Sequence, residues 1–107
     1  MTGYRSVYIT TESLEEASRI GRIIVEERLA ACVNIIKDMQ SIYWWEGKVE
    51  EATEVVLIAK TSDSRLDALT ARVRALHSYD CPCIVALPIN EAEGNAEYLA
   101  WIDKETA

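Results

Sequence analysis

The sequence contains little glycine, little proline and few basic residues. Four Gly and two Pro occur among 107 residues, of which 50% are apolar, and this balance argues against a disordered chain. Lys and Arg number 11 against 18 Asp and Glu, which gives a net charge of −7. Because a negative chain does not attract phosphate backbones or anionic lipids, we expect no nucleic-acid partner and no membrane partner. Cations or a basic protein are the better candidates.

Long hydrophobic runs are also absent, since no apolar stretch approaches the roughly 20 residues that span a membrane. We find no signal-peptide core near the amino terminus, and we therefore expect a cytoplasmic protein. The length fits a single domain over residues 1–107 and excludes two domains with a cleft between them. Three cysteines cannot all pair within one chain, and cytoplasmic thiols stay reduced, so a disulfide framework is not expected.

The first predicted elements are a strand and a helix. Apolar and polar residues alternate over residues 5–11, which is the period of a strand. Ser13 and Glu16 then have the S-x-x-E spacing of a capping box, which favours a helix start. The apolar residues that follow recur on one helical face, and we expect this helix to end near Leu29.

Two long strands are predicted next, over residues 31–45 and 49–61, both rich in β-branched or aromatic residues. A glycine-containing turn at 46–48 joins them into a hairpin. A polar break at 37–40 suggests a bulge or a bend in the first strand. Residues 55–59 are apolar throughout, as is typical of a strand buried on both faces.

A second helix follows the hairpin. Asp63 or Ser64 can cap it. Its apolar positions form an uninterrupted stripe of core residues, namely Leu66, Leu69, Val73 and Leu76. This spacing predicts a helix that packs on the sheet.

The carboxy-terminal part predicts a strand over residues 83–87 that closes at Pro88, and a short helix capped by Asn95 that runs through Asp103. The element order is therefore βαββαβ with one terminal helix. Right-handed crossovers leave few arrangements for this order. We predict an α+β, ferredoxin-like fold: an antiparallel four-stranded sheet with both main helices on one face, a long β-hairpin and a short C-terminal helix.

The hairpin is too long for its own domain. A globule of 107 residues has a radius of gyration of about 13 Å and a diameter of roughly 33 Å. At about 3.3 Å per residue, strands of this length reach ~40–50 Å. The tip carries Ile42, Tyr43, Trp44 and Trp45, and monomers rarely leave such a patch in water, so we expect a second chain to cover it. The alternative is that the break at 37–40 turns the tip back onto its own sheet.

Four stretches resemble the CutA divalent-cation-tolerance family. They are R-L-A-A-C-V-N-I-I at 28–36, S-I-Y-W-W-E-G-K-V-E at 41–50, and Lys60-Thr61 together with Leu76-His77-x-Tyr79. The match covers essentially the whole chain, in order and with the expected separations.

This resemblance implies a ferredoxin-like subunit in a tight homotrimer, similar in plan to PII signal proteins, with the hairpins packed between subunits. It implies a role in tolerance of copper and other divalent metal ions, without a defined enzymatic activity. It also implies that Cys32, Trp45, Lys60, His77 and Tyr79 lie on the family's characteristic positions, around a cleft between subunits.

One segment departs from the family pattern. Where the family usually reads H-P-Y-E-x-P-E-I, residues 77–84 read H-S-Y-D-C-P-C-I, so Cys83 replaces a glutamate and a soft ligand replaces a hard one. Cys81 and Cys83 are two apart in an extended segment and should leave the same face, with His77 four residues upstream. Thiolates and imidazole bind Cu(I) or Zn(II), which suggests a soft-metal site. Packing of both thiols as small apolar groups is the alternative.

Each of the remaining candidate site residues also has two interpretations. Cys32 is either a metal ligand or a packed residue, and His77 is either a ligand or a polar cap. Lys60, if buried, needs a carboxylate or a bound anion, and with Trp45 and Tyr79 it suggests an alternative function: a PII-like sensor or scaffold for a small anionic ligand. We find no glycine-rich phosphate cradle and no Cys–His signature, and we expect no enzyme. The leading hypothesis is a trimeric divalent-cation tolerance protein that binds copper or another divalent metal ion.

Overall fold

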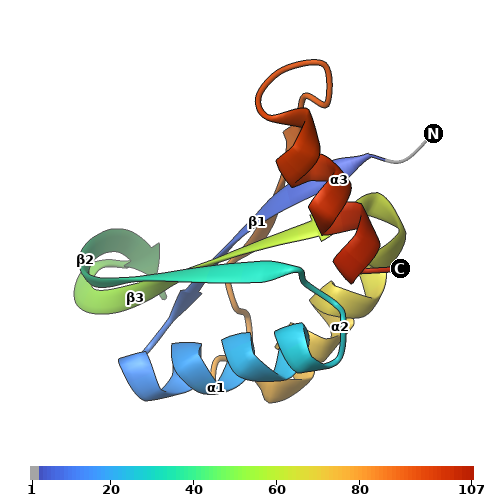
Figure 1. Ribbon diagram of the computed structural model, residues 1–107. Helices are drawn as coiled ribbons and strands as arrows, with labels where there is room; N and C mark the ends of the chain where they lie inside the picture. The colour runs from blue at the N-terminus through green and yellow to red at the C-terminus, as the bar shows by residue number, and fades with distance from the viewer. Residues whose placement is uncertain (1–2) are drawn as a thin grey trace.

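The computed structural model describes residues 3–107, and the first two residues of the expected domain lie outside the described residues. Its elements, in order, are β1 (Tyr4–Thr11), α1 (Leu14–Glu26), β2 (Cys32–Trp45), β3 (Lys48–Ser62), a 3₁₀ turn (Asp63–Arg65), α2 (Leu66–Leu76), β4 (Ile84–Ile89) and α3 (Ala96–Glu105) (Figure 1). This is the predicted βαββαβ order with a terminal helix. No helix within residues 3–107 has the length and apolar character needed to cross a membrane.

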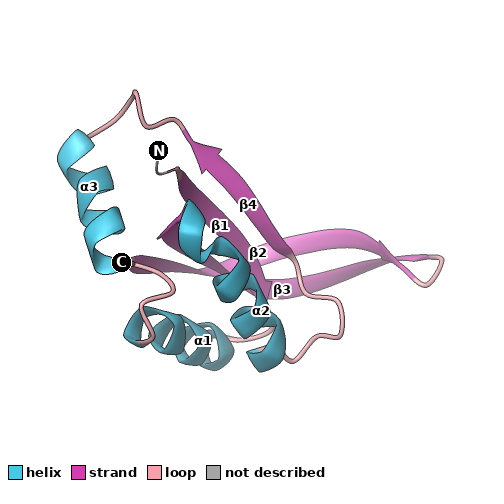
Figure 2. Cartoon of the chain, turned by 90° about the vertical axis from the view of Figure 1, so that its right-hand side faces the viewer, coloured by secondary structure: helices cyan, strands magenta, loops and turns pink. Residues whose placement is uncertain are grey.

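The four strands form one antiparallel sheet in the order β2-β3-β1-β4. Helices α1 and α2 cover one face of this sheet, and α3 packs at one end of the opposite face (Figures 1 and 2). The main core lies between the sheet and α1 and α2, and its fully buried side chains include Val7, Ile9, Ile20, Ile24, Leu57, Leu69 and Val73. The predicted α+β, ferredoxin-like fold is therefore confirmed.

The hairpin of β2 and β3 contains the predicted bulge. The pairing shifts between Ile36 and Met39, and Asp38 in between has a left-handed φ of 62°. A bulge increases local twist and bends the ribbon, and the hairpin curls beyond this point (Figure 1). At the tip, Glu46 and Gly47 have φ values of 50° and 80°, the positive values that a two-residue hairpin turn of type I′ requires.

The bend does not bury the tip on its own sheet. The hairpin extends beyond the body of the chain (Figure 2). The extents of the chain, hairpin included, are 44 × 26 × 22 Å. Trp44 is 75% exposed and Ile42 is 69% exposed. The chain therefore leaves apolar side chains of the tip in water.

The sheet face opposite α1 and α2 is also incompletely covered. Three apolar side chains of β2 and β4 are about half exposed, namely Ile36, Val85 and Leu87. Because α3 packs on one end of this face only, through Leu99 and Ile102, the rest of the face remains open.

Helix α1 begins as predicted and ends earlier. The Ser13 hydroxyl accepts a hydrogen bond from the Glu16 backbone N–H at 3.1 Å, which confirms the cap. The helix ends at Glu26 instead of Leu29, because Arg28 adopts a left-handed φ of 63°. The Arg28 and Leu29 N–H groups then donate to carbonyls of the last helical turn, as in a Schellman motif with arginine at the usual glycine position.

Two further boundaries differ from prediction. Neither Asp63 nor Ser64 caps α2, because a 3₁₀ turn precedes the helix: Asp63 forms an ion pair with Arg5 at 3.1 Å, and Ser64 hydrogen bonds to Ser62. Strand β4 begins one residue late and continues through Pro88. A proline is tolerated there because β4 is an edge strand, which needs backbone donors on one side only.

Candidate functional site

A cavity of about 690 Å³ lies between the hairpin and the loop that joins α2 to β4. Its lining residues come from β1, β2, β3 and that loop: Tyr8, Thr10, Met39, Gln40, Ser41, Ile42, Tyr43, Trp45, Glu54, Tyr79, Asp80, Cys81 and Cys83. This volume falls within the ~300–1,000 Å³ typical of small-molecule sites. A second hollow of about 340 Å³ between α2 and β4 contains none of the predicted site residues.

Strand alternation explains why the hairpin contributes so many lining side chains. Side chains of alternate β2 residues point to the same face of the hairpin. Four side chains on this face line the cavity, namely Met39, Ser41, Tyr43 and Trp45. Glu54 pairs with Met39 across the ladder and so shares this face. The Tyr8 hydroxyl of β1 donates to the Met39 sulfur at 3.2 Å, which ties the hairpin to the body of the sheet.

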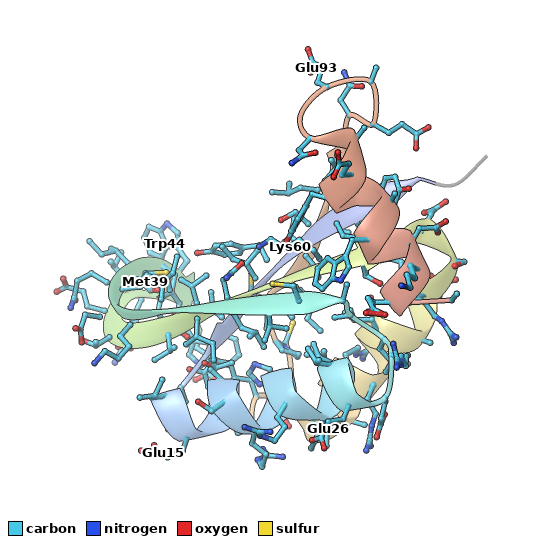
Figure 3. All side chains as sticks on the ribbon, viewed as in Figure 1. Glu15, Glu26, Met39, Trp44, Lys60 and Glu93 are labelled. Carbon is cyan, nitrogen blue, oxygen red and sulfur yellow. The ribbon has the colours of Figure 1, made fainter. Side chains whose placement is uncertain are left out.

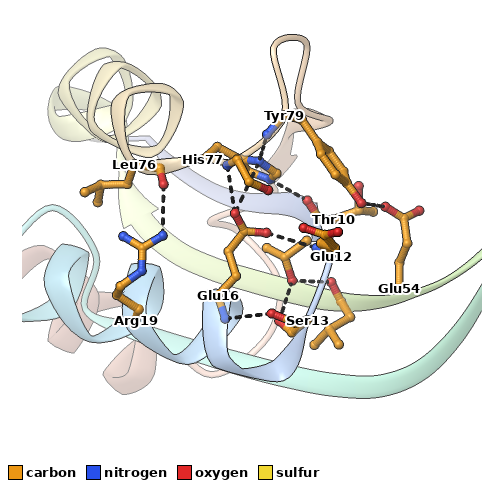
Figure 4. A network of polar contacts seen from close by, with 12 residues as sticks. Thr10, Glu12, Ser13, Glu16, Arg19, Glu54, Leu76, His77 and Tyr79 are labelled. Carbon is orange, nitrogen blue, oxygen red and sulfur yellow. Dashed lines mark hydrogen bonds and ion pairs between the residues drawn. The ribbon is translucent and has the colours of Figure 1, made fainter.

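The opposite wall is a loop that α1 holds in place (Figure 4). The buried Glu16 carboxylate accepts the backbone N–H of Glu12 at 3.0 Å and that of Ser78 at 2.7 Å. Burial alone raises the pKa of Glu16, but the hydrogen bonds from Glu12 and Ser78 outweigh it, so that the pKa is lowered overall. Glu16 thus serves both as part of the helix cap and as a clamp on the loop.

His77 is a structural anchor of the same loop. Its side chain is fully buried, Nε2 donates to the Thr10 carbonyl at 2.7 Å, and Nδ1 accepts the Tyr79 backbone N–H at 3.1 Å. Because one ring nitrogen donates and the other accepts, this arrangement requires the neutral imidazole with its proton on Nε2. Both nitrogens are occupied by the protein, so His77 presents no free ligand atom to the cavity.

Tyr79 and Glu54 meet inside the cavity. The Tyr79 hydroxyl donates to the Glu54 carboxylate at 2.9 Å, and Glu54 is only 8% exposed. Burial, the hydrogen bond to Glu54 and the charges of Glu54, Glu12 and Glu16 all raise the pKa of Tyr79. The hydroxyl therefore stays protonated and remains a donor to Glu54.

Cys81 and Cys83 both line this cavity, as their spacing predicts for two residues on one face. Both are free thiols, with Cys81 exposed and Cys83 half-buried. Asp80 lies on the same wall. Within residues 3–107, however, no group of three or more His, Cys, Asp and Glu side chains is arranged to hold a metal ion.

Two other predicted site residues lie elsewhere. Cys32 begins β2 and pairs across the ladder with Lys60, six positions along β3 from Glu54. Burial and the neighbouring Cys32 thiol raise the pKa of the Tyr98 hydroxyl, so this thiol lies close to α3. Lys60 lies on the sheet face opposite α1 (Figure 3). Its ammonium donates to the Asn34 side-chain carbonyl, not to a carboxylate. The chain thus brings Trp45, Tyr79, Cys81 and Cys83 to the cavity, while Cys32, Lys60 and His77 do not line it.

Glu54, Met39 and Tyr8 were not among the predicted site residues. Glu54 belongs to an acidic stretch that resembles an ordinary solvated strand, and its burial depends on the curl of the hairpin towards Tyr79. The sequence nevertheless contained a relevant signal, the bulge at 37–38. Before the bulge, even-numbered residues of β2 share a face with even-numbered residues of β3; after it, odd-numbered residues of β2 do, which places Met39 on the face of Glu54.

Comparison with known proteins gives a consistent result. The family of the CutA1 divalent ion tolerance protein matches residues 5–105. The divalent-cation tolerance protein CutA of Archaeoglobus fulgidus is 49% identical over 98 residues, which are 92% of this chain and 93% of the relative. The chloroplastic protein CutA 1 of rice (Oryza sativa) is 49% identical over 100 residues, which are 94% of this chain and 55% of that longer relative.

Solved structures agree with these matches. The crystal structure of CutA1 from Oryza sativa superposes with a TM-score of 0.93 at 47% identity, covering 98% of this chain and 94% of the other.

Proposed function

Because this chain belongs to the CutA family of divalent-cation tolerance proteins, we propose that it binds copper or another divalent metal ion as a homotrimer, with Cys81 and Cys83 as its thiolate ligands. The observation that carries this proposal is the pair of free thiols that open into one cavity. The expected role is metal homeostasis, in which the ion is cargo and no bond of a substrate is broken.

The donor set supports a soft metal ion of modest affinity. Two thiolates favour Cu(I) or Zn(II), and the neighbouring Asp80 adds a carboxylate. A closed structural zinc site takes four protein ligands, and two thiols of one subunit supply half of them. We therefore propose that water or a neighbouring subunit completes the coordination. His77 is excluded from this set because the backbone already engages both of its ring nitrogens.

The proposal of a trimer is supported by what a single subunit leaves uncovered. The hairpin extends beyond the subunit, Trp44 at its tip is 75% exposed, and the open sheet face exposes Val85 and Leu87. Patches of this kind mark contacts with other protein chains. Light scattering should give a mass of three times the 12.0 kDa chain, and a particle of 12.0 kDa at micromolar concentration would contradict the trimer.

The charges of the cavity favour a cation over the small anionic ligand of the alternative hypothesis. Trp45 and Tyr79 line the cavity, but Lys60 does not, and the charged residues of the lining are Glu54 and Asp80. An anion would be repelled by both carboxylates. A PII-like role for an anionic ligand therefore has no support from the lining of one subunit.

Equilibrium dialysis of the reduced protein against Cu(I) and Zn(II) tests the proposed ligands. Cys81→Ser and Cys83→Ser should each weaken binding, and the double variant should abolish the specific component. Cys32→Ser is the matched control, because Cys32 lies close to α3 and outside the cavity. Unchanged metal binding in the Cys81→Ser, Cys83→Ser protein would refute the proposed site. Loss of metal binding in Cys32→Ser alone would instead place the metal site at the start of β2.

We also propose a cytoplasmic location, which keeps the three cysteines reduced and able to bind metal. Thiol titration of protein isolated rapidly under acid-quench conditions should find all three free. Oxidation of Cys81 or Cys83 in protein isolated in this way would argue against a cytoplasmic location.

A further inference from the structure

His77 is a buried titratable side chain that the proposed metal site does not use. It is the only histidine in the sequence, and its side chain is fully buried within the chain. Nε2 donates to the Thr10 carbonyl of β1 at 2.7 Å, and Nδ1 accepts the Tyr79 backbone N–H at 3.1 Å. Because both hydrogen bonds are made within one chain, this arrangement does not depend on what covers the hairpin.

The hydrogen bond at Nδ1 exists only while the imidazole is neutral. A protonated imidazole carries N–H donors on both ring nitrogens, and an N–H group cannot accept a hydrogen bond from another N–H group. Protonation of His77 therefore keeps the bond to the Thr10 carbonyl and removes the bond from the Tyr79 N–H. Histidine is the side chain whose ordinary charge change falls between about pH 5 and 8. Mild acidification is thus the condition that tests this bond.

A second partner for a protonated Nδ1 lies nearby (Figure 4). Oε2 of the Glu16 carboxylate, on α1, is 3.9 Å from Nδ1. This carboxylate is buried and its pKa is lowered, so it stays ionised under mild acidification. A shift of about 1 Å brings Nδ1 within the ~2.9 Å of a charge-assisted hydrogen bond. Glu16 can therefore receive the proton-bearing nitrogen that Tyr79 loses.

The other charged and titratable groups near the imidazole also favour its positive form. The Arg19 guanidinium of α1 donates to the Leu76 carbonyl. The Tyr79 ring lies 4.9 Å from the imidazole between ring centroids, and its raised pKa keeps it protonated. Glu54 of β3 and Glu12, which follows β1, both act on Tyr79 with negative charge. Among these groups the carboxylates outnumber the guanidinium, which favours a positively charged ring.

We propose that His77 is a pH-sensitive latch on Tyr79: a solvent proton that binds Nδ1 breaks the bond from the Tyr79 N–H and forms an ion pair with Glu16 instead. The Ser78 N–H keeps its bond to the Glu16 carboxylate, so the release is confined to Tyr79. Because the Tyr79 hydroxyl joins this loop to β3 through Glu54, acidification loosens the tie between the loop and the hairpin. The latch goes beyond the proposed metal function, since it uses neither thiol and operates in metal-free protein.

Nuclear magnetic resonance of the isotope-labelled, reduced and metal-free full chain, without a histidine tag, tests the latch. Because the chain has one histidine, every imidazole signal belongs to His77. At about pH 8 the ring nitrogens should report the neutral form with its proton on Nε2, and at about pH 5 both should carry protons.

In the same step, hydrogen exchange of the Tyr79 amide should accelerate about fivefold or more relative to that of the Ser78 amide. The ratio of the two rates removes the ordinary pH dependence of amide exchange. An imidazole that stays neutral down to about pH 5, or one that is protonated without this change in the ratio, would overturn the proposal.

Glu16→Gln tests the partner of the protonated ring, because it removes the charge that receives Nδ1–H. The imidazole should titrate about 1 pH unit lower in this variant than in Glu15→Gln, which makes the same change at an exposed residue of the same helical turn. Equal midpoints in the two variants would overturn the role of Glu16. The wild-type measurement needs neither variant.

His77→Asn removes the titration and keeps an acceptor, because an asparagine side chain can accept the N–H two residues further on, as in an Asx turn. The ratio of Tyr79 to Ser78 exchange should then be independent of pH. A ratio that still rises on acidification would assign the release to another group and contradict the latch.

Discussion

Replacing Glu16 with glutamine tests how the loop that carries Cys81 and Cys83 is held. The carboxylate accepts two backbone hydrogen bonds, from Glu12 at 3.0 Å and from Ser78 at 2.7 Å. Hydrogen bonds to a charged group contribute ~1.5–3 kcal/mol each, and neutral ones about 1 kcal/mol. Glutamine retains one acceptor oxygen, so one bond is lost and the other becomes neutral. The free energy of unfolding should fall by about 2–5 kcal/mol.

Urea unfolding at neutral pH measures this loss, with Glu15→Gln as the control. Glu15 lies in the same first turn of α1 and is exposed, so its replacement should change the free energy of unfolding by less than about 1 kcal/mol. Hydrogen exchange of the Ser78 amide should also accelerate in the Glu16 variant, because its charged acceptor is either lost or becomes neutral. An equal free energy of unfolding for the two variants would refute the clamp.

The pH dependence of stability provides a second measure of the same group. The folded-state pKa of Glu16 lies below its ordinary value of 4.5, so folding favours the ionised form. The resulting stabilisation is present above pH 4.5 and is lost as the pH falls through the lower folded-state value. The difference in stability between wild type and Glu16→Gln should therefore shrink on acidification below about pH 4.5. A difference that stays constant down to pH 2 would contradict the assignment.

Two further predictions concern the packing and the end of α1. Gly21→Ala should lower the free energy of unfolding by about 1 kcal/mol. The Cβ of the alanine would lie 3.0 Å from the Val33 side chain and 3.3 Å from that of the buried Leu57. An increase in stability, as for an ordinary helix position, would contradict this close approach. Arg28→Gly should raise the melting temperature and stabilise the fold by about 0.5–1 kcal/mol, because glycine relieves the left-handed conformation. A drop in melting temperature for this variant would show that the ion pair of Arg28 with Glu105 outweighs the backbone strain.

The fold was largely predictable because its local signals agree with one another. The Ser13 cap, the bulge near Asp38 and the turn at Gly47 each depend on a few neighbouring residues, and each is present in the structure. The end of α1 was missed because arginine takes the conformation that glycine usually marks. The length of β4 was missed because Pro88 is allowed on an edge strand, and edge position is a property of the whole sheet.

The candidate site was predictable only in part, because its contacts join residues far apart in the sequence. The same-face arrangement of Cys81 and Cys83 follows from their spacing, and both line the cavity. The contact of Tyr79 with Glu54, 25 residues away, depends on the curl of the hairpin. The burial of His77 depends on its bond to the Thr10 carbonyl, 67 residues away, and no local pattern indicates that both of its nitrogens are engaged.

X-ray absorption of the metal-loaded protein tests whether Cys81 and Cys83 bind the cation. With Zn(II), we expect sulfur neighbours at about 2.3 Å in the wild type, and their loss in the Cys81→Ser, Cys83→Ser protein. A zinc ion surrounded only by nitrogen or oxygen at about 2.0–2.2 Å in the wild type would contradict it.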